Sequence, residues 1–134
     1  MKLVLLLLVI AVAVNCQTPW RWCNGSSGKN LNVTNVEVDP SPVMKGFLTN
    51  FEITGVARTD IWQNKAVLDV MNGGSKVYTG INTQPYFAPQ GQPYDNWFLM
   101  TFPSFLPSGN FLININLVDM NNQLIECIEV KAQF

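Results

Sequence analysis

Few side chains in this chain of 134 residues could carry out covalent chemistry. Histidine is absent, which excludes Ser–His and Cys–His nucleophilic pairs in their usual form. The nine acidic residues are scattered, and nothing in their spacing points to the carboxylate pair of a glycosidase. The segment Asn72-Gly-Gly-Ser75 lacks the lysine and the helix of a phosphate-binding loop. We therefore predict that the protein is not an enzyme and that it uses no cofactor and no metal ion.

The first residues predict a secretory signal peptide. Met1 and Lys2 form a short basic start, and residues 3–14 are an unbroken apolar run. This run is too short to span a bilayer, which takes about 20 residues, but it is typical of a signal peptide. We place the cleavage after Cys16, so that residues 17–134 form one domain. The predicted location is outside the cell or in the endolysosomal lumen.

Cleavage at this position would leave two cysteines, Cys23 and Cys127. In an oxidising compartment a disulfide is the default, with two buried thiols as the alternative. Asn24 and Asn32 each begin a glycosylation sequon, so both are candidate glycosylation sites. Loss of Lys2 would leave seven basic residues against nine acidic ones, a net charge of −2, with no basic run. Nucleic acid is therefore not an expected partner.

The C-terminal segment has the clearest structural pattern. Apolar residues alternate with others over residues 111–118 and again over residues 128–134. This period of two is typical of strands that bury one face. Residues 119–123 are rich in Asn and Asp, which suit a turn. The pattern predicts a long antiparallel hairpin that buries Ile113, Ile115 and Ile128.

Other short segments also read as strands, and no helical period is present. Residues 57–64 are predicted to form a polar connection. Residues 82–96, which contain three prolines, have the least regular pattern and are predicted to form a long loop. With the hairpin, about seven antiparallel strands are expected, which favours an all-β, immunoglobulin-like sandwich, with a small barrel as the alternative. The remaining predicted strands are residues 32–38, 46–56, 65–71, 76–81 and 96–102.

Aromatic side chains gather in the segments between these predicted strands. Tyr86, Phe87, Tyr94 and Trp97 lie in or beside one predicted long loop, and residues 102–107 form a second apolar connection. In one interpretation these residues pack inward and fill the end of the hydrophobic core. In the other they rim a mouth between the two sheets, which would lead to an apolar cavity suited to a lipid. Each methylene group removed from water there contributes about 0.8 kcal/mol.

Three motifs carry a resemblance to a known family. They are Leu106-Pro-Ser-Gly-Asn-Phe111, Leu117-Val-Asp119 and Leu124-Ile-Glu-Cys127. With the early Cys23, they resemble the ML lipid-recognition domain family over residues 17–134. Members of this family include Niemann–Pick type C2 sterol carriers, the ganglioside GM2 activator and phosphatidylglycerol/phosphatidylinositol transfer proteins.

The resemblance implies an immunoglobulin-like sandwich with a lipid cavity between its sheets. It also implies that Cys23 pairs with Cys127. The two additional short-range disulfides of the family's animal sterol carriers are absent, which favours the phospholipid-transfer branch over a tight sterol site. The lipid-binding candidates, as wall or rim of the cavity, are Phe51, Tyr86, Phe87, Tyr94 and Phe98.

These inferences predict a secreted lipid carrier. It would bind a lipid between its sheets and transfer it between membranes, with phosphatidylglycerol or phosphatidylinositol as the expected ligand. The alternatives are sterol binding and transport, or a secreted recognition module whose apolar loops dock a protein partner. Transient membrane contact and a monomeric state are expected.

Overall fold

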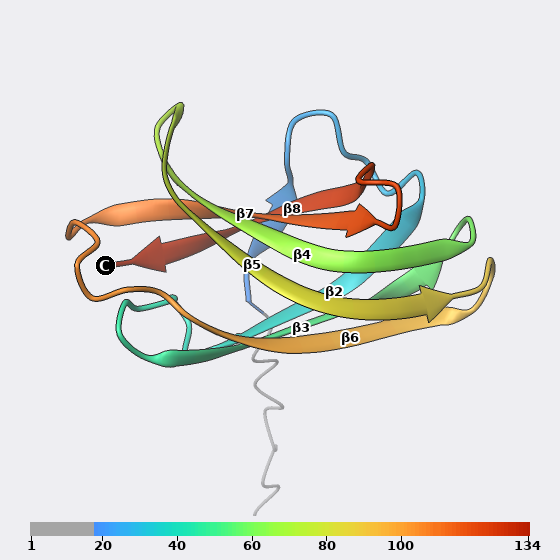
Figure 1. Cartoon of the computed structure of the whole chain (residues 1–134), viewed down its shortest axis with the longest axis horizontal. Helices are drawn as coiled ribbons and strands as arrows, with labels where there is room; N and C mark the ends of the chain where they lie inside the picture. Colours follow the sequence, from blue (N-terminus) through green and yellow to red (C-terminus); the bar gives the residue numbers. More distant parts are fainter. Residues whose placement is uncertain (1–17) are drawn as a thin grey trace, which may run out of the picture.

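Eight strands and no helix make up the part of the chain that this computed structural model describes, residues 18–134 (Figure 1). The predicted signal peptide, residues 1–16, lies outside the described residues. No described segment is a helix long and apolar enough to cross a membrane. The strands are β1 Trp20–Trp22, β2 Leu31–Asp39, β3 Leu48–Ala57, β4 Ile61–Asn72, β5 Ser75–Ala88, β6 Pro93–Thr101, β7 Asn110–Asp119 and β8 Leu124–Gln133.

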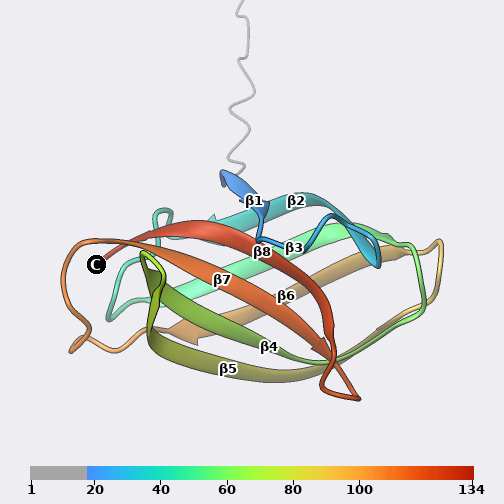
Figure 2. The same ribbon diagram turned by 90° about the horizontal axis from the view of Figure 1, so that it is seen from above.

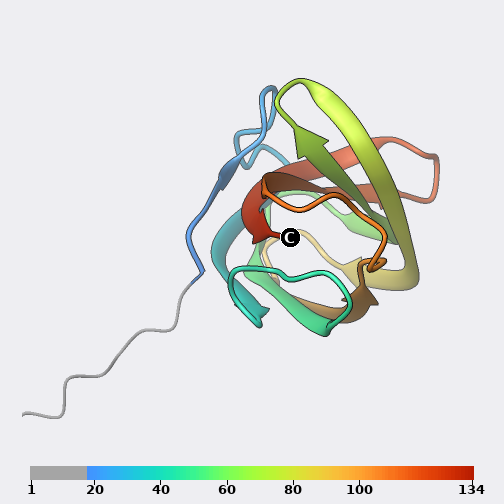
Figure 3. The same ribbon diagram turned by 90° about the vertical axis from the view of Figure 1, so that its left-hand side faces the viewer.

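The strands form two antiparallel sheets that lie over one another as layers (Figures 2 and 3). The larger sheet has the order β1-β8-β7-β4-β5, and the smaller sheet has the order β2-β3-β6. All strand pairs within the two sheets are antiparallel. The predicted immunoglobulin-like sandwich is therefore confirmed, and the C-terminal hairpin is formed by β7 and β8.

The core lies between the layers, on the faces that the alternating pattern predicts. Ile113, Ile115 and Leu117 of β7 are buried, and Ile115 stands opposite both Leu68 of β4 and Ile128 of β8. Sheets packed face to face normally fill the space between them with side chains from both inner faces. The burial of these residues follows directly from the period of two in the sequence.

Two predicted connections are strands in the structure. The expected polar connection of residues 57–64 is wrong in its second half, because β4 begins at Ile61. The expected loop of residues 82–96 is also wrong, because β5 continues to Ala88 and β6 begins at Pro93. β5 and β6 are each the edge strand of their sheet. A proline in an edge strand, such as Pro85 in β5, need not remove a hydrogen bond between strands. The short strand β1, paired with β8, was not expected.

One long edge of the sandwich is fastened by a disulfide. Cys23, just after β1, is bonded to Cys127 in β8 with a Cα–Cα distance of 5.3 Å. Ser26 Oγ accepts a hydrogen bond of 2.9 Å from the backbone N–H of Cys127. The disulfide therefore ties the N-terminal segment to the larger sheet.

The same edge is also crossed by hydrogen bonds between the two sheets. Thr18, before β1, donates its backbone N–H to Val36 O of β2 over 3.2 Å and accepts from the N–H of Val38 over 2.9 Å. The buried carboxylate of Glu126 in β8 accepts from the N–H of Asn30 over 2.8 Å and from that of Leu31 at 3.4 Å. These contacts join β2 of the smaller sheet to β8 and the N-terminal segment of the larger sheet.

Candidate functional site

The opposite long edge, where β5 faces β6, is held in a different way. We call these facing strands the seam. Asn82 donates its side-chain N–H to Leu99 O over 3.2 Å, and Asp95 donates its backbone N–H to the Tyr86 hydroxyl over 3.1 Å. Within residues 18–134, no backbone–backbone hydrogen bond joins β5 to β6. The seam can therefore open without breaking either sheet.

Two of the predicted lipid-binding residues, Phe51 and Phe98, face the interior. Their rings are stacked with centroids 5.2 Å apart and an interplanar angle of 12°. Phe102 meets Phe51 edge to face at 6.4 Å, and all three side chains are buried. Stacked and edge-to-face aromatic pairs add stability beyond the burial of their area. At this point the expected cavity between the sheets is filled by these three rings, so a lipid tail would have to displace them.

Two tyrosines form the inner wall close to the seam. The rings of Tyr86 and Tyr94 meet edge to face with centroids 4.9 Å apart. The Tyr94 hydroxyl is hydrogen-bonded to Gln63 Oε1 and accepts from Asn96 Nδ2 over 3.3 Å. Burial disfavours the charged phenolate and raises the pKa of Tyr94 well above its ordinary value. Tyr94 is therefore a neutral hydrogen-bonding group at every physiological pH.

This buried polar cluster of Gln63, Tyr94 and Asn96 is not fully satisfied. All three side chains are at least 98 % buried, and Gln63 Nε2 has no hydrogen-bond partner among the described protein atoms. Leaving a buried donor unpaired costs about 1–3 kcal/mol. An oxygen atom of a ligand between the sheets could accept this free N–H. Gln63 was not predicted as an inner residue, because a register shift between Gln63 and Lys65 interrupts the alternation that would have marked it.

Phe87, another predicted lipid-binding residue, lies on the outer face of the larger sheet. It is the cross-strand neighbour of Trp62, and their rings stack with centroids 3.9 Å apart. Both rings remain about half exposed. The structure thus brings Phe51, Tyr86, Tyr94 and Phe98 to the interior and places Phe87 outside it.

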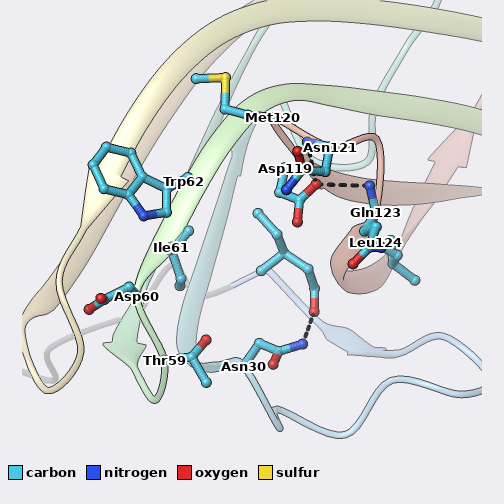
Figure 4. Close-up of a pocket in the computed structure, with 11 residues that line it drawn as sticks. Asn30, Thr59, Asp60, Ile61, Trp62, Asp119, Met120, Asn121, Gln123 and Leu124 are labelled. Carbon is cyan, nitrogen blue, oxygen red and sulfur yellow. Dashed lines mark hydrogen bonds between the residues drawn. The ribbon is translucent and has the colours of Figure 1, made fainter.

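A hollow of about 530 Å³ lies at the end of the sandwich that carries the β7–β8 turn (Figure 4). Its apolar part includes Ile61 and Trp62. Asp119 Oδ1 accepts from the N–H groups of Asn121 and Gln123 over 2.8 and 2.9 Å, which shapes the turn. No basic side chain is among the described residues that line the hollow. It offers acceptors to hydroxyl groups and no counter-charge to a phosphate.

Acidic residues gather on the outer face of the smaller sheet. A hydrogen bond with Asp95 raises the pKa of Glu52 above its usual 4.5, with smaller contributions from partial burial and from the negative charges of Asp95 and Glu37. Glu52 stands opposite Glu37 in the β2–β3 pair. Like charges that face one another across strands are destabilising.

This repulsion leads to a prediction for Glu52→Gln. A carboxyl group whose pKa is raised in the folded state favours folding when protonated, and that contribution is lost as the pH rises through the folded pKa. We therefore expect Glu52→Gln to raise the melting temperature at pH 7, by an amount corresponding to under about 1 kcal/mol because exposed charges interact weakly. The difference should vanish below the usual Glu pKa of 4.5. Thermal melts across this pH range would test it, and a variant that is less stable at pH 7 would contradict it.

Comparisons with known proteins agree with this fold. A Dictyostelium discoideum protein named "Putative phosphatidylglycerol/phosphatidylinositol transfer protein" is 26 % identical to the chain over 137 residues, which cover 97 % of each protein. A Niemann–Pick type C2 protein from the Japanese carpenter ant superposes with a TM-score of 0.65 at 12 % identity, over 86 % of this chain and 98 % of its own. The predicted resemblance to the ML lipid-recognition family is confirmed. No family model matches the chain.

A second solved structure shares the ML fold. Chicken MD-1, complexed with lipid IVa, superposes with a TM-score of 0.60 at 13 % identity, over 86 % of this chain and 88 % of its own. At such low identity the likeness shows the fold alone. The sandwich described above therefore has the same fold as these two structures, and the sequence similarity to the Dictyostelium relative extends over the whole domain.

Proposed function

We propose that this protein is a secreted lipid carrier, which binds a phospholipid between its two sheets and moves it between membranes. Phosphatidylglycerol or phosphatidylinositol is the proposed ligand, in line with the name of the Dictyostelium relative. The Cys23–Cys127 disulfide suits an oxidising compartment such as the cell exterior or the endolysosomal lumen.

The observation that carries the proposal is the unequal closure of the two long edges. One edge is crossed by several hydrogen bonds between the sheets, and beside them a disulfide within the larger sheet anchors the segment that leads into β2. The seam holds two hydrogen bonds, one donated by the Asn82 side chain and one accepted by the Tyr86 hydroxyl, each of which contributes about 0.5–1.5 kcal/mol. Burial of a few methylene groups at about 0.8 kcal/mol each is enough to offset their loss.

Binding would then need two movements and no covalent step. The seam parts at a membrane, and acyl tails enter between the two sheets and displace the stacked rings of Phe51 and Phe98 from the interior. The free N–H of Gln63 can donate to an ester carbonyl or hydroxyl oxygen of the lipid. Tails bound in this way are shielded from water during transfer, and the reverse steps release them at the acceptor membrane.

A transfer assay with fluorescent phospholipid in donor vesicles tests the proposal. The protein is expected to accelerate transfer to acceptor vesicles over the blank, with phosphatidylglycerol or phosphatidylinositol moved faster than phosphatidylcholine. A parallel assay with fluorescent sterol distinguishes the sterol alternative. No acceleration with any of these lipids would remove the carrier function and leave a protein-docking module.

The seam itself can be tested by filling it. A Cβ atom at Gly80 in β5 would lie 2.8 Å from Met100 Sδ of β6, at the flexible end of that side chain. Once the Met100 side chain shifts aside, the added methyl groups make apolar contacts across the seam that opening must break. We therefore expect Gly80→Val to fold and to slow transfer by about tenfold, which corresponds to about 1.4 kcal/mol of barrier. Gly74→Val is the matched control, because nothing lies within 4 Å of its Cβ position. Equal transfer rates for both variants, with unchanged melting temperatures, would mean that lipid does not pass through the seam.

A further inference from the structure

Exposed apolar side chains collect beside the seam and on two loops at one end of the sandwich. Phe105 is the most exposed large hydrophobic residue described, at 81 %, and the others are more than 40 % exposed. Monomeric proteins rarely leave such groups contiguous unless the surface binds something. We name this surface the apolar strip, and it consists of Phe47, Leu48, Trp97, Leu99 and Phe105.

Strand pairing makes the strip continuous. Leu48 of β3 pairs with Thr101 of β6, and Leu99 is the next residue of β6 on the same outer face. Trp97 follows Leu99 on that face and stands opposite Glu52 of β3, where the strip ends at the acidic group of the same face. Because side chains two residues apart on a strand point to the same face, these residues form one surface. The Asn82–Leu99 hydrogen bond places this surface directly against the seam.

Contacts between the two loops extend the strip to the end of the molecule. The backbone N–H of Gly46 donates to Phe102 O over 2.8 Å, and a Cβ atom at Gly46 would lie 3.0 Å from Ser104 Oγ. These contacts hold the loop before β3 against the loop before β7, as the left side of Figure 1 shows. Phe47 and Phe105 each follow directly after a contacting residue, so the two exposed rings lie on neighbouring loop tips.

The charges at this end indicate what the strip contacts. Residues 40–47 and 102–109 contain one charged side chain, Lys45. Its ammonium group already donates to Leu106 O over 2.6 Å and to Ser108 Oγ over 3.2 Å. The loops at the other end of the sandwich carry Lys29, Arg58 and Asp119, among others. Two adjacent loops with exposed aromatic rings and almost no charge suit the boundary between lipid headgroups and acyl chains.

We propose that the apolar strip is the surface by which this protein docks on a lipid bilayer, with Phe47 and Phe105 inserted among the headgroups. This inference rests on the proposed carrier function, and it adds the orientation of the carrier. Docking in this way lays the seam against the membrane surface. A lipid tail could then pass from the bilayer into the sandwich with little exposure to water.

Sedimentation with phosphatidylcholine vesicles tests the strip. The wild type is expected to bind, and binding should persist at high salt because apolar contacts are not screened. Phe105→Asp and Phe47→Asp should each weaken binding by about tenfold. Met120→Asp is the control, because Met120 is an exposed apolar residue in the β7–β8 turn at the other end. Circular dichroism melts verify that each variant is folded.

Several outcomes would overturn the docking surface. They are no sedimentation of the wild type, binding that requires anionic lipid and disappears with salt, or equal weakening by Met120→Asp. A change in oligomeric state on Phe105→Asp without loss of vesicle binding would instead assign the strip to a protein contact.

A second measurement separates this inference from the carrier function. Monomeric short-chain phosphatidylglycerol, one of the two proposed ligands, needs no docking, so Phe105→Asp should bind it as the wild type does. Vesicle binding without binding of short-chain lipid would support the docking surface and overturn the carrier function. Binding of short-chain lipid without vesicle binding would do the reverse.

Discussion

Replacement of both Cys23 and Cys127 by serine is expected to lower the free energy of unfolding by about 4.7 kcal/mol, the chain-entropy value for a closed loop of about a hundred residues. The two cysteines are 104 residues apart, so their bond restricts almost the whole unfolded chain of the domain. Since domains are stable by only about 5–15 kcal/mol, the loss should remove between about a third and nearly all of the stability.

Urea denaturation of the double variant measures this effect. The reduced wild type is the internal control, because reduction removes the same crosslink without changing any other atom of the chain. Both should unfold at a similarly lowered urea midpoint. A double variant whose midpoint equals that of the oxidised wild type would show that the disulfide does not stabilise the fold.

Phe51→Ala is expected to cost about 3–5 kcal/mol, the usual range for truncation of a fully buried phenylalanine. Phe51 has no exposed surface and contacts the rings of both Phe98 and Phe102, so its removal leaves a cavity between the sheets. Phe47→Ala makes the same chemical change at an exposed position and should alter stability by no more than about 0.5 kcal/mol. Urea denaturation of the two variants gives the comparison, and equal costs would contradict the placement of Phe51 in the core.

Phe51→Ala also reports on the lipid. If acyl tails occupy the space between the sheets, a saturating lipid should raise the melting temperature of Phe51→Ala more than that of the wild type. The reason is that the tails fill a cavity already present, and a ligand that binds the folded state more tightly stabilises it more. An equal rise for both proteins would place the tails away from Phe51.

The strands in which apolar and polar residues alternate without interruption could be predicted from the sequence alone. The β7–β8 hairpin follows from the alternation around Ile113, Ile115 and Ile128, and the turn follows from its Asn and Asp content. The β5–β6 region could not be predicted in this way, because prolines were read as breaks. Whether Pro85 ends a strand depends on whether that strand is an edge, and the edge position is a property of the whole sheet.

The candidate site residues also divide into those that local alternation could place and those that depend on how the whole sheets pack. Tyr94 and Phe98 have equal parity on β6, so both face inward. Tyr86 and Phe87 are neighbours on one strand, where successive side chains point to opposite faces. They could be expected to act together only if they lay in a loop. Gln63 and Asn96 could not be identified as a pair at all, because their proximity to Tyr94 arises from the packing of the two sheets.

The contrast between the two long edges makes the sandwich a lever. β8, next to the disulfide, is the natural pivot, and β5 is the far end of the same sheet. With three strand spacings of about 4.8 Å between them, a tilt of about 15° would swing β5 by about 4 Å. That displacement is about one carbon–carbon contact distance. A rotation too small to disturb the pivot is thus magnified, at the free end, into an aperture on the scale of a hydrocarbon chain.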